Sequence, residues 1–168
     1  MKKQGFTLIE LMVVIVIMGI LAAVAVPKLF GMIAKSKASE VGPAAGTYVK
    51  LQQAYFSEAN KVGGWQMIGY MAPSGDVASE TTNFKYNPSD AIGVATSIAL
   101  GTGDTRGWTA ENKVNLNECK AGVNWAIDMT KSTDTNKGDD VVFKALIDVT
   151  SQNGGCAALT PSFTNIGK

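Results

Sequence analysis

The sequence predicts an α+β fold in which a long N-terminal helix packs on a small antiparallel β-sheet. Three observations lead to this prediction. An almost unbroken apolar run covers residues 6–26. A stripe of apolar residues at helical spacing follows it. Short runs of alternating apolar and polar residues, typical of strands, fill much of the second half. The helix is therefore expected to span a membrane with its first half and to cover a sheet with its second.

The membrane-spanning half is predicted from length and surroundings. Phe6 to Val26 is about 21 residues, close to the roughly 20 that cross a bilayer as a helix. Its apolar residues lie all round the helix, so it needs lipid or burial among other helices. Lys2 and Lys3 precede the run, and the next basic residue is Lys28. The positive-inside rule then places Lys2 and Lys3 in the cytoplasm and the rest of the protein outside.

The helix is expected to continue as an amphipathic segment over residues 29–62. Gly19 and Pro27 are weak points before it, since Pro27 donates no hydrogen bond to the carbonyl of Ala23 and crowds that turn. The apolar stripe includes Gln52 as its one polar member. Its positions are Val41, Ala44, Ala45, Tyr48, Leu51, Gln52, Tyr55 and Ala59.

The bounds of this helix follow from its glycines and prolines. We expect one helix from Phe6 to about Lys61, roughly 80 Å long at 1.5 Å per residue. Gly42-Pro43 predicts a bend, and Gly63-Gly64 predicts the end.

The remaining residues, 63–168, predict a globular domain built on an antiparallel sheet. The segments expected to contain strands span residues 84–86, 92–100, 123–129 and 143–149. The segments rich in turn-forming residues span residues 101–107 and 131–140, and we expect loops there. One face of the sheet should pack on residues 41–55.

Composition excludes several classes of function. The chain contains no histidine, which rules out Ser-His and Cys-His nucleophiles and histidine-ligated metals. Lys plus Arg is 15 and Asp plus Glu is 14, so charge gives no case for nucleic acid as the main ligand. Gly101-Thr102-Gly103 is a lone GxG without a P-loop lysine. We therefore expect neither an enzyme nor a cofactor.

The two cysteines, Cys119 and Cys156, lie too far apart for a CxxC redox pair and cannot complete a zinc site without histidine. In an exported domain they would most simply form one disulfide. It would close a loop of roughly 38 residues, and the chain-entropy account gives about 4 kcal/mol for such a loop. Two unrelated buried thiols are the alternative.

One weak candidate for a metal site is a calcium loop with alternating oxygen ligands, formed by Asp134, Asn136, Asp139 and Asp140. Its spacing is not that of an EF-hand, and its twelfth position is Ala145 rather than Glu. A solvated turn is the favoured interpretation, so no metal is assigned.

The N-terminus carries a resemblance to a known family. The stretch Gly5-Phe6-Thr7-Leu8-Ile9-Glu10-Leu11-Met12-Val13-Val14 resembles the processing site and helix start of type IV pilin-like proteins. This family includes type IV pilins and the major pseudopilins of type II secretion. The likeness covers roughly residues 2–30, with a short basic leader, Gly5, Phe6, an acid five positions into the mature chain, and a later proline. It implies the type IV pilin fold.

The resemblance gives residues 5, 6 and 10 their expected roles. It implies that residues 1–5 are a leader cut off by a prepilin peptidase between Gly5 and Phe6, and that the new amine of Phe6 is methylated. Residues 6–28 become the transmembrane and assembly helix. Glu10 is expected to pair with the Phe6 amine of a neighbouring subunit, because a buried charge is strongly disfavoured unless it is paired. Snorkelling of Glu10 to the membrane interface is the alternative.

For the whole protein, the resemblance implies a structural subunit of a type IV pilus, with a disulfide-bounded C-terminal region. The expected partners are other copies of the chain, the prepilin peptidase, the inner membrane, and an inner-membrane assembly platform with its ATPase. The subunit is expected in the inner membrane before assembly and on the cell surface afterwards.

Two alternatives remain. A major pseudopilin would form a short periplasmic filament and needs the same helix. The other alternative is a membrane-anchored periplasmic enzyme or ligand-binding domain. It would not explain Gly5-Phe6 or Glu10, and the sequence has no strong set of catalytic residues.

Overall fold

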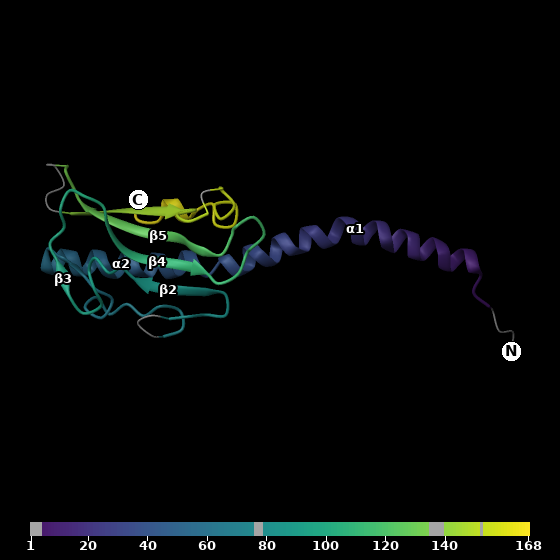
Figure 1. The fold of residues 1–168 in the computed structure, drawn as a ribbon, viewed down its shortest axis with the longest axis horizontal. Coiled ribbons are helices and arrows are strands. Elements are labelled where there is room, and N and C mark those ends of the chain that lie inside the picture. Colours follow the sequence, from purple (N-terminus) through teal and green to yellow (C-terminus); the bar gives the residue numbers. More distant parts are fainter. Residues whose placement is uncertain (1–4, 76–78, 135–139, 152) are drawn as a thin grey trace.

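The computed structural model describes residues 5–75, 79–134, 140–151 and 153–168. It confirms the α+β fold. The element order is α1 (Leu8–Ala38), α2 (Val41–Ala59), β1 (Val62–Gly63), β2 (Phe84–Pro88), β3 (Ser97–Ile98), β4 (Thr105–Asn112), β5 (Gly122–Lys131), β6 (Val141–Ile147) and the short 3₁₀ helix η1 (Phe163–Asn165). The first part of α1 extends away from the domain, and α2 lies along the sheet (Figure 1).

The expected long N-terminal helix is confirmed, since helical residues run from Leu8 to Ala59, but its interruption comes just before Gly42-Pro43 and not at these residues. The chain forms two helices separated by a turn at Ser39 and Glu40. Pro43 has no N–H to donate to the carbonyl of Ser39, so the helical hydrogen bonding is interrupted one turn before the proline. The N–H of Ser39 donates to Ser36 instead, at 3.3 Å, and α2 restarts with Ala44 donating to Glu40 at 3.3 Å.

The end of α2 lies close to the position predicted near Lys61. The helix stops at Ala59, where Asn60 adopts the left-handed conformation at φ 52° and donates its N–H to Phe56. Gly63 and Gly64 do not end the helix. They lie where the backbone packs so closely against other residues that a side chain would not fit. A Cβ on Gly64 would collide with the carbonyl oxygens of Gly93 and Val94. By contrast, α1 runs through both predicted weak points, Gly19 and Pro27.

A four-stranded antiparallel sheet has the order β2-β4-β5-β6, and β1 pairs with β3 in a separate two-stranded sheet. The predicted strands at 84–86 and 123–129 are confirmed, and the predicted strand at 143–149 is confirmed up to Ile147. The long strand predicted over 92–100 was wrong, because only Ser97 and Ile98 form a strand there.

Strand β4 was missed, and its first residues fell in the loop predicted at 101–107. Its pairing with β5 shifts register between Arg106 and Trp108 and again between Ala110 and Glu111. Such irregularities break the two-residue alternation by which a strand is recognised. A Cβ on Gly107 would also collide with the Tyr48 hydroxyl, so a residue that weakens strands elsewhere is required here.

The core forms where α2 meets one face of the sheet, as expected. The largest fully buried side chains include Trp65, Trp108, Trp125, Tyr48, Tyr86, Phe84 and Phe163. Gln52, the polar member of the predicted stripe, is fully buried and explained by its contacts. Its amide donates to the Tyr48 hydroxyl at 3.0 Å and exchanges two hydrogen bonds with the backbone of Gly63. The end of α2 is thereby tied to β1.

Candidate functional site

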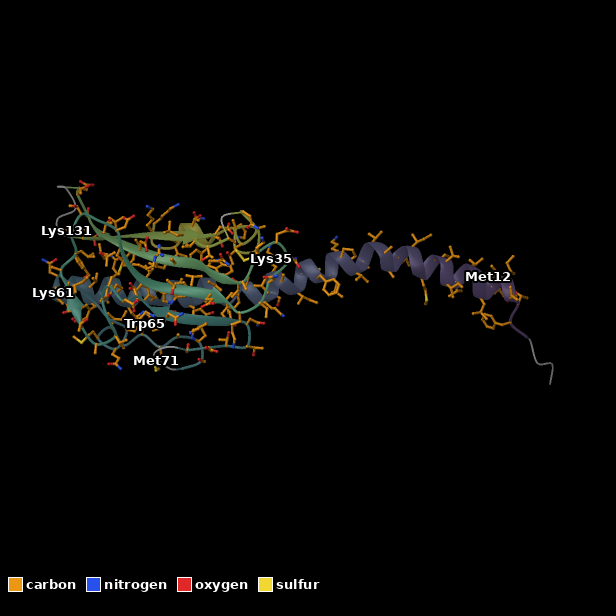
Figure 2. The ribbon with its side chains drawn as sticks, in the orientation of Figure 1. Met12, Lys35, Lys61, Trp65, Met71 and Lys131 are labelled. Carbon is orange, nitrogen blue, oxygen red and sulfur yellow. A yellow bond between two sulfur atoms is a disulfide. The ribbon has the colours of Figure 1, made fainter. Side chains whose placement is uncertain are left out.

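The candidate site is the exposed apolar part of α1, residues 8–33. Figure 2 shows the side chains around Met12 projecting on all sides of the helix, well clear of the sheet domain. In α1 the structure buries only Ala34 and Ala38. Among the described residues, the helical stretch Leu8–Ala59 is long and apolar enough to cross a membrane by length and composition, and its most apolar part is not buried. Such a surface needs lipid or other helices around it.

The lone acid of this surface is held by its own helix start. Thr7 is the N-cap of α1, and its side chain accepts a hydrogen bond from the backbone N–H of Glu10. In return, the Glu10 carboxylate accepts bonds from the Thr7 backbone N–H at 2.9 Å and from the Thr7 hydroxyl at 2.7 Å. This is a capping box, which satisfies amides that the first turn of a helix leaves unpaired.

The sequence reasoning did not assign a role to Thr7. The spacing Thr7-Leu8-Ile9-Glu10 is the S/T-x-x-E signature of a capping box, so the signal was present. Gly5 and Phe6 lie just before the N-cap, outside the helix, and Phe6 is 81% exposed. The predicted processing bond is therefore in an open, non-helical segment.

A second cluster, at the turn between the helices, was also missed. Oε1 of Glu40 accepts hydrogen bonds from the Thr81 hydroxyl at 2.6 Å and from the Tyr86 hydroxyl at 2.9 Å. Burial, and then the nearby Glu40 carboxylate, raise the pKa of Tyr86 well above its ordinary value. No local sequence signal joins residues that are more than 40 positions apart. This contact ties the turn between α1 and α2 to β2 and to the segment just before it.

The expected disulfide is present between Cys119 and Cys156, whose Cα atoms are 4.6 Å apart. It ties the segment after β6 to the loop before β5. The turn at its second cysteine is held by Asp148, whose carboxylate accepts hydrogen bonds from the N–H groups of Cys156 at 2.9 Å and Ala157 at 3.2 Å. The C-terminal region is thus anchored by one covalent bond and by side-chain capping.

The weak calcium candidate gains no support. Asn136 and Asp139 lie outside the described residues. Asp140 accepts hydrogen bonds from its neighbour Val141 and from Gln53. In the part of the chain that the structure describes, no group of three or more acidic, cysteine or histidine side chains is placed to hold a metal.

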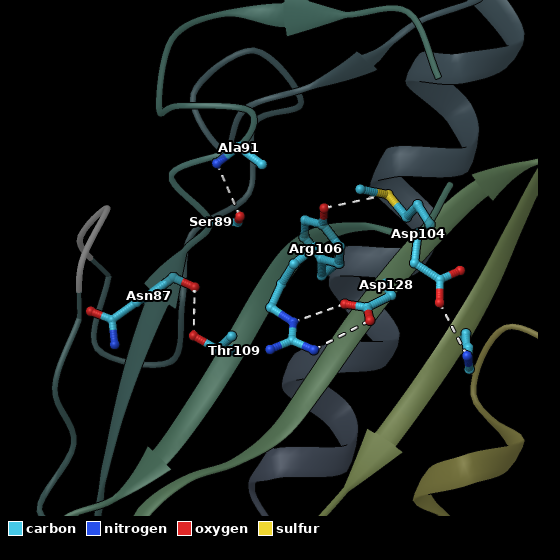
Figure 3. Close-up of polar contacts among 10 residues, drawn as sticks. Asn87, Ser89, Ala91, Asp104, Arg106, Thr109 and Asp128 are labelled. Carbon is cyan, nitrogen blue, oxygen red and sulfur yellow. Dashed lines mark hydrogen bonds and ion pairs between the residues drawn. The ribbon is translucent and has the colours of Figure 1, made fainter. Parts of the chain in front are cut away.

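The outer face of the sheet carries ion pairs rather than a site. Arg106 on β4 donates two hydrogen bonds to the Asp128 carboxylate on β5, at 2.9 and 3.3 Å (Figure 3). The bond to Asp128 raises the pKa of Arg106. Lys144 on β6 pairs with Asp104 at 3.1 Å. The first pair joins the neighbouring strands β4 and β5, and the second joins β6 to the residue before β4.

Fold and site together define a class: a protein with a long apolar helix, led by one acid, that carries a disulfide-linked sheet domain. Comparison with known proteins agrees. Residues 1–26 match the family described as the prokaryotic N-terminal methylation motif. Fimbrial protein EcpC of Eikenella corrodens is 38% identical over 111 residues, which are 62% of this chain and 68% of that protein. The chain belongs to the type IV pilin family.

Two further relatives match over shorter stretches. The type IV major pilin protein PilA of Myxococcus xanthus is 43% identical over 60 residues, 36% of this chain and 27% of that protein. A type IV major fimbrial protein FimA of Dichelobacter nodosus is 33% identical over 90 residues, 51% of this chain and 56% of that protein. No solved structure matches the chain. Membership in this family places the chain among structural proteins and not among enzymes.

Proposed function

We propose that the chain is the structural subunit of a type IV pilus and polymerises through α1. The observation that carries this proposal is the exposure of α1. Large apolar side chains from Leu8 to Ile33 are 42–76% exposed. In the sheet domain, by contrast, most of the large apolar side chains are buried in a core. A helix of this kind is stable in a membrane before assembly and among neighbouring helices after it. One surface therefore suits both environments in turn.

Processing is proposed between Gly5 and Phe6, followed by methylation of the Phe6 amine. The match of residues 1–26 to the methylation motif supports this step. The open segment before the N-cap supports it as well, because a peptidase must bind its substrate in an extended form. Removal of Lys2 and Lys3 lowers the formal net charge from +1 by two. The prepilin peptidase is the proposed partner.

Glu10 is proposed to pair with the Phe6 amine of a neighbouring subunit. Both hydrogen bonds from Thr7 end on Oε2 of Glu10. A carboxylate accepts on both of its oxygens, so Oε1 can receive a bond from an incoming amine without breaking the capping box. Thr7 thus holds the carboxylate close to the helix start, where the partner's amine would have to reach it.

The proposed sequence of locations follows from the helix. Before assembly, the subunit is held in the inner membrane by α1, with its sheet domain on the side away from the cytoplasm. An assembly platform with its ATPase then moves it into a filament on the cell surface. The test is a deletion strain complemented with the wild-type gene. We expect surface filaments only with the gene, and mass spectrometry of sheared filaments should find a chain that begins at methylated Phe6. Filaments confined to the periplasm would indicate a pseudopilin, and an intact Met1 would contradict the processing step.

A further inference from the structure

Helix α2 carries two charged side chains that the single chain does not use. Lys50 and Glu58 are both exposed, and among the described residues neither takes part in a hydrogen bond or an ion pair. Glu58 also lies in the last turn of the helix, where the negative end of the helix dipole disfavours an acid. A partner for these charges is therefore to be sought on another molecule.

Both charges lie on one exposed stripe along α2, which consists of Pro43, Thr47, Lys50, Ala54 and Glu58. Their spacing of four, three, four and four residues keeps them on the same side of a helix. Apart from the two charges, the side chains of this stripe are compact. The large exposed apolar side chains of the described residues do not include any from α2. A neighbour that packs on the stripe would approach closely, and charge rather than apolar burial would decide its position.

The stripe is complementary to a shifted copy of itself. Lys50 and Glu58 are eight residues apart, which is about 12 Å along the helix and too far for an ion pair within it. A second, parallel copy shifted by about 12 Å towards its own C-terminus brings its Lys50 level with Glu58 of the first. A shift of one turn, about 5.4 Å, would instead place Lys50 level with Ala54 and leave both charges unpaired.

The pairing proposed for Glu10 requires nearly the same shift. From Leu8 to Glu10 is two helical rises, about 3 Å, and the non-helical residues Phe6 and Thr7 add at most about 7 Å. A copy that presents its Phe6 amine to Glu10 is therefore shifted by up to about 10 Å. In both pairs the cation precedes the acid along the chain, so the two shifts have the same direction.

One shift can satisfy both pairs, because α2 continues in the direction of α1 (Figure 1). The flexible four-carbon stem of Lys50 covers the difference of about 2 Å. We propose that, in the filament, Lys50 of each copy pairs with Glu58 of a neighbouring copy and fixes the register of α2. The inference rests on the polymerisation through α1 proposed above, and it adds a second registering contact at the opposite end of the helical stretch from Glu10. Ion pairs between helices set partner choice and orientation in coiled coils in the same way.

The same shift does not set like charges against one another. It places Lys28 level with the region of Lys35, but these lysines are seven residues apart and share one face of α1, within about 20°. Lys50 and Glu58 differ by about 80° around α2, so two neighbours that pair through them meet through different faces. Two lysines on a single face cannot occupy both sides of such a contact.

Charge reversals in the full chain, expressed in the deletion strain, test the pair. Lys50→Glu and Glu58→Lys each set like charges opposite one another, so we expect the yield of sheared filament to fall on the order of tenfold. The double variant Lys50→Glu/Glu58→Lys restores opposite charges and should return to within about twofold of wild type. Co-expression of the two single variants should also restore filaments, because each variant then finds its complement in a copy of the other.

The matched control is Lys61→Glu/Glu58→Lys, which has the same net charge as the double variant. Lys61 lies just past α2, at the end of the domain where Figure 2 labels it, and its reversal leaves two cations facing each other at the proposed pair. The control should therefore assemble as poorly as Glu58→Lys. Yield is scored per mature subunit in the membrane fraction, so that a loss of folding is not counted as a loss of assembly.

The outcomes separate this pair from the proposed function. Wild-type yields from the single variants, the failure of either rescue, or restoration by the control would overturn the contact between Lys50 and Glu58 and leave polymerisation through α1 standing. Absence of surface filaments with the wild-type chain would overturn the proposed function, and the contact with it.

Discussion

Glu40 and Tyr86, 46 residues apart in sequence, are joined by a 2.9 Å hydrogen bond that fixes the junction of the two helices to β2. The donor is a buried tyrosine hydroxyl, and the acceptor is a carboxylate at the first residue before α2. Charged acceptors make stronger hydrogen bonds than neutral ones. The turn between α1 and α2 is therefore held to the sheet by a tertiary contact.

This bond predicts a coupled loss of stability. Glu40→Gln and Tyr86→Phe should each lower the free energy of unfolding of the full chain by about 1–3 kcal/mol, since each leaves a partner less well satisfied. The double variant should lose less than the sum of the two, with a coupling of about 0.5–3 kcal/mol. Denaturant unfolding in detergent measures the cycle. Glu58→Gln, a matched change at an exposed acid of α2, should have little effect, and strict additivity would disprove the coupling.

Glu10→Gln and Glu10→Ala should leave membrane insertion and cleavage largely intact, because neither changes Gly5 or the apolar run. An uncharged residue even enters lipid more easily. Assembly should fail or become inefficient, since the incoming amine loses its carboxylate. Thr7→Val is the comparison, because it removes the hydroxyl of the capping box and keeps the charge, and it should assemble better than Glu10→Ala.

The measurement compares mature subunit in the membrane fraction with sheared extracellular filament for each variant. If Glu10 merely snorkels to the interface, neutral residues there should assemble normally. A wild-type filament yield from Glu10→Ala would therefore refute the pairing while leaving the family assignment intact.

Gly5→Val should accumulate uncut precursor in the inner membrane, because a branched side chain next to the scissile bond obstructs the peptidase. The substitution should not disturb folding, since a Cβ at Gly5 meets no atom within 4 Å. Immunoblotting shows the larger precursor. Gly19→Ala, another glycine with open space around it, serves as the control and should be processed normally.

The disulfide between Cys119 and Cys156 predicts that alkylation of denatured filaments without reductant labels neither thiol. Replacing either cysteine should lower the free energy of unfolding by about 2–5 kcal/mol. Both residues are fully buried, so a labelling experiment on the folded chain would not distinguish the two states. Quantitative labelling under denaturing conditions would show that the bond is absent in filaments.

Stability should decline at alkaline pH because of buried tyrosines. Burial raises the pKa of Tyr70 to about 12, and its hydroxyl accepts a bond from Trp108 and donates to the carbonyl of Ala44. The unfolded chain ionises such a group near pH 10. The folded state therefore binds this proton more tightly, so its contribution is complete below about pH 10 and is lost as pH rises towards about 12.

Denaturant unfolding at pH 8 and pH 11, with tyrosine ionisation followed by ultraviolet absorbance, tests this dependence. Burial raises the pKa of Tyr48 and Tyr86 as well, so the three should ionise together with unfolding. Tyr70→Phe should weaken the fall in stability between the two pH values. An unchanged free energy of unfolding at pH 11 would contradict the prediction.

Much of the fold was accessible from local patterns. The apolar helix, the amphipathic stripe including Tyr48, and the strand at 123–129 all follow from periodicity within a short window. The missed strand has a tertiary cause. β4 was missed because its register shifts at Arg106 and Ala110 depend on how β5 lies beside it. Gly107 looks like a turn residue until the hydroxyl of Tyr48 is placed against it.

The sequence by itself determined the long apolar helix and its single acid at Glu10, because these depend on residue chemistry and on spacing along one element. Only the tertiary structure decided that Glu40 meets Tyr86 and that Gln52 ties α2 to Gly63. Each of these contacts joins distant segments whose mutual placement is set by packing of the whole core, and no local pattern encodes that placement.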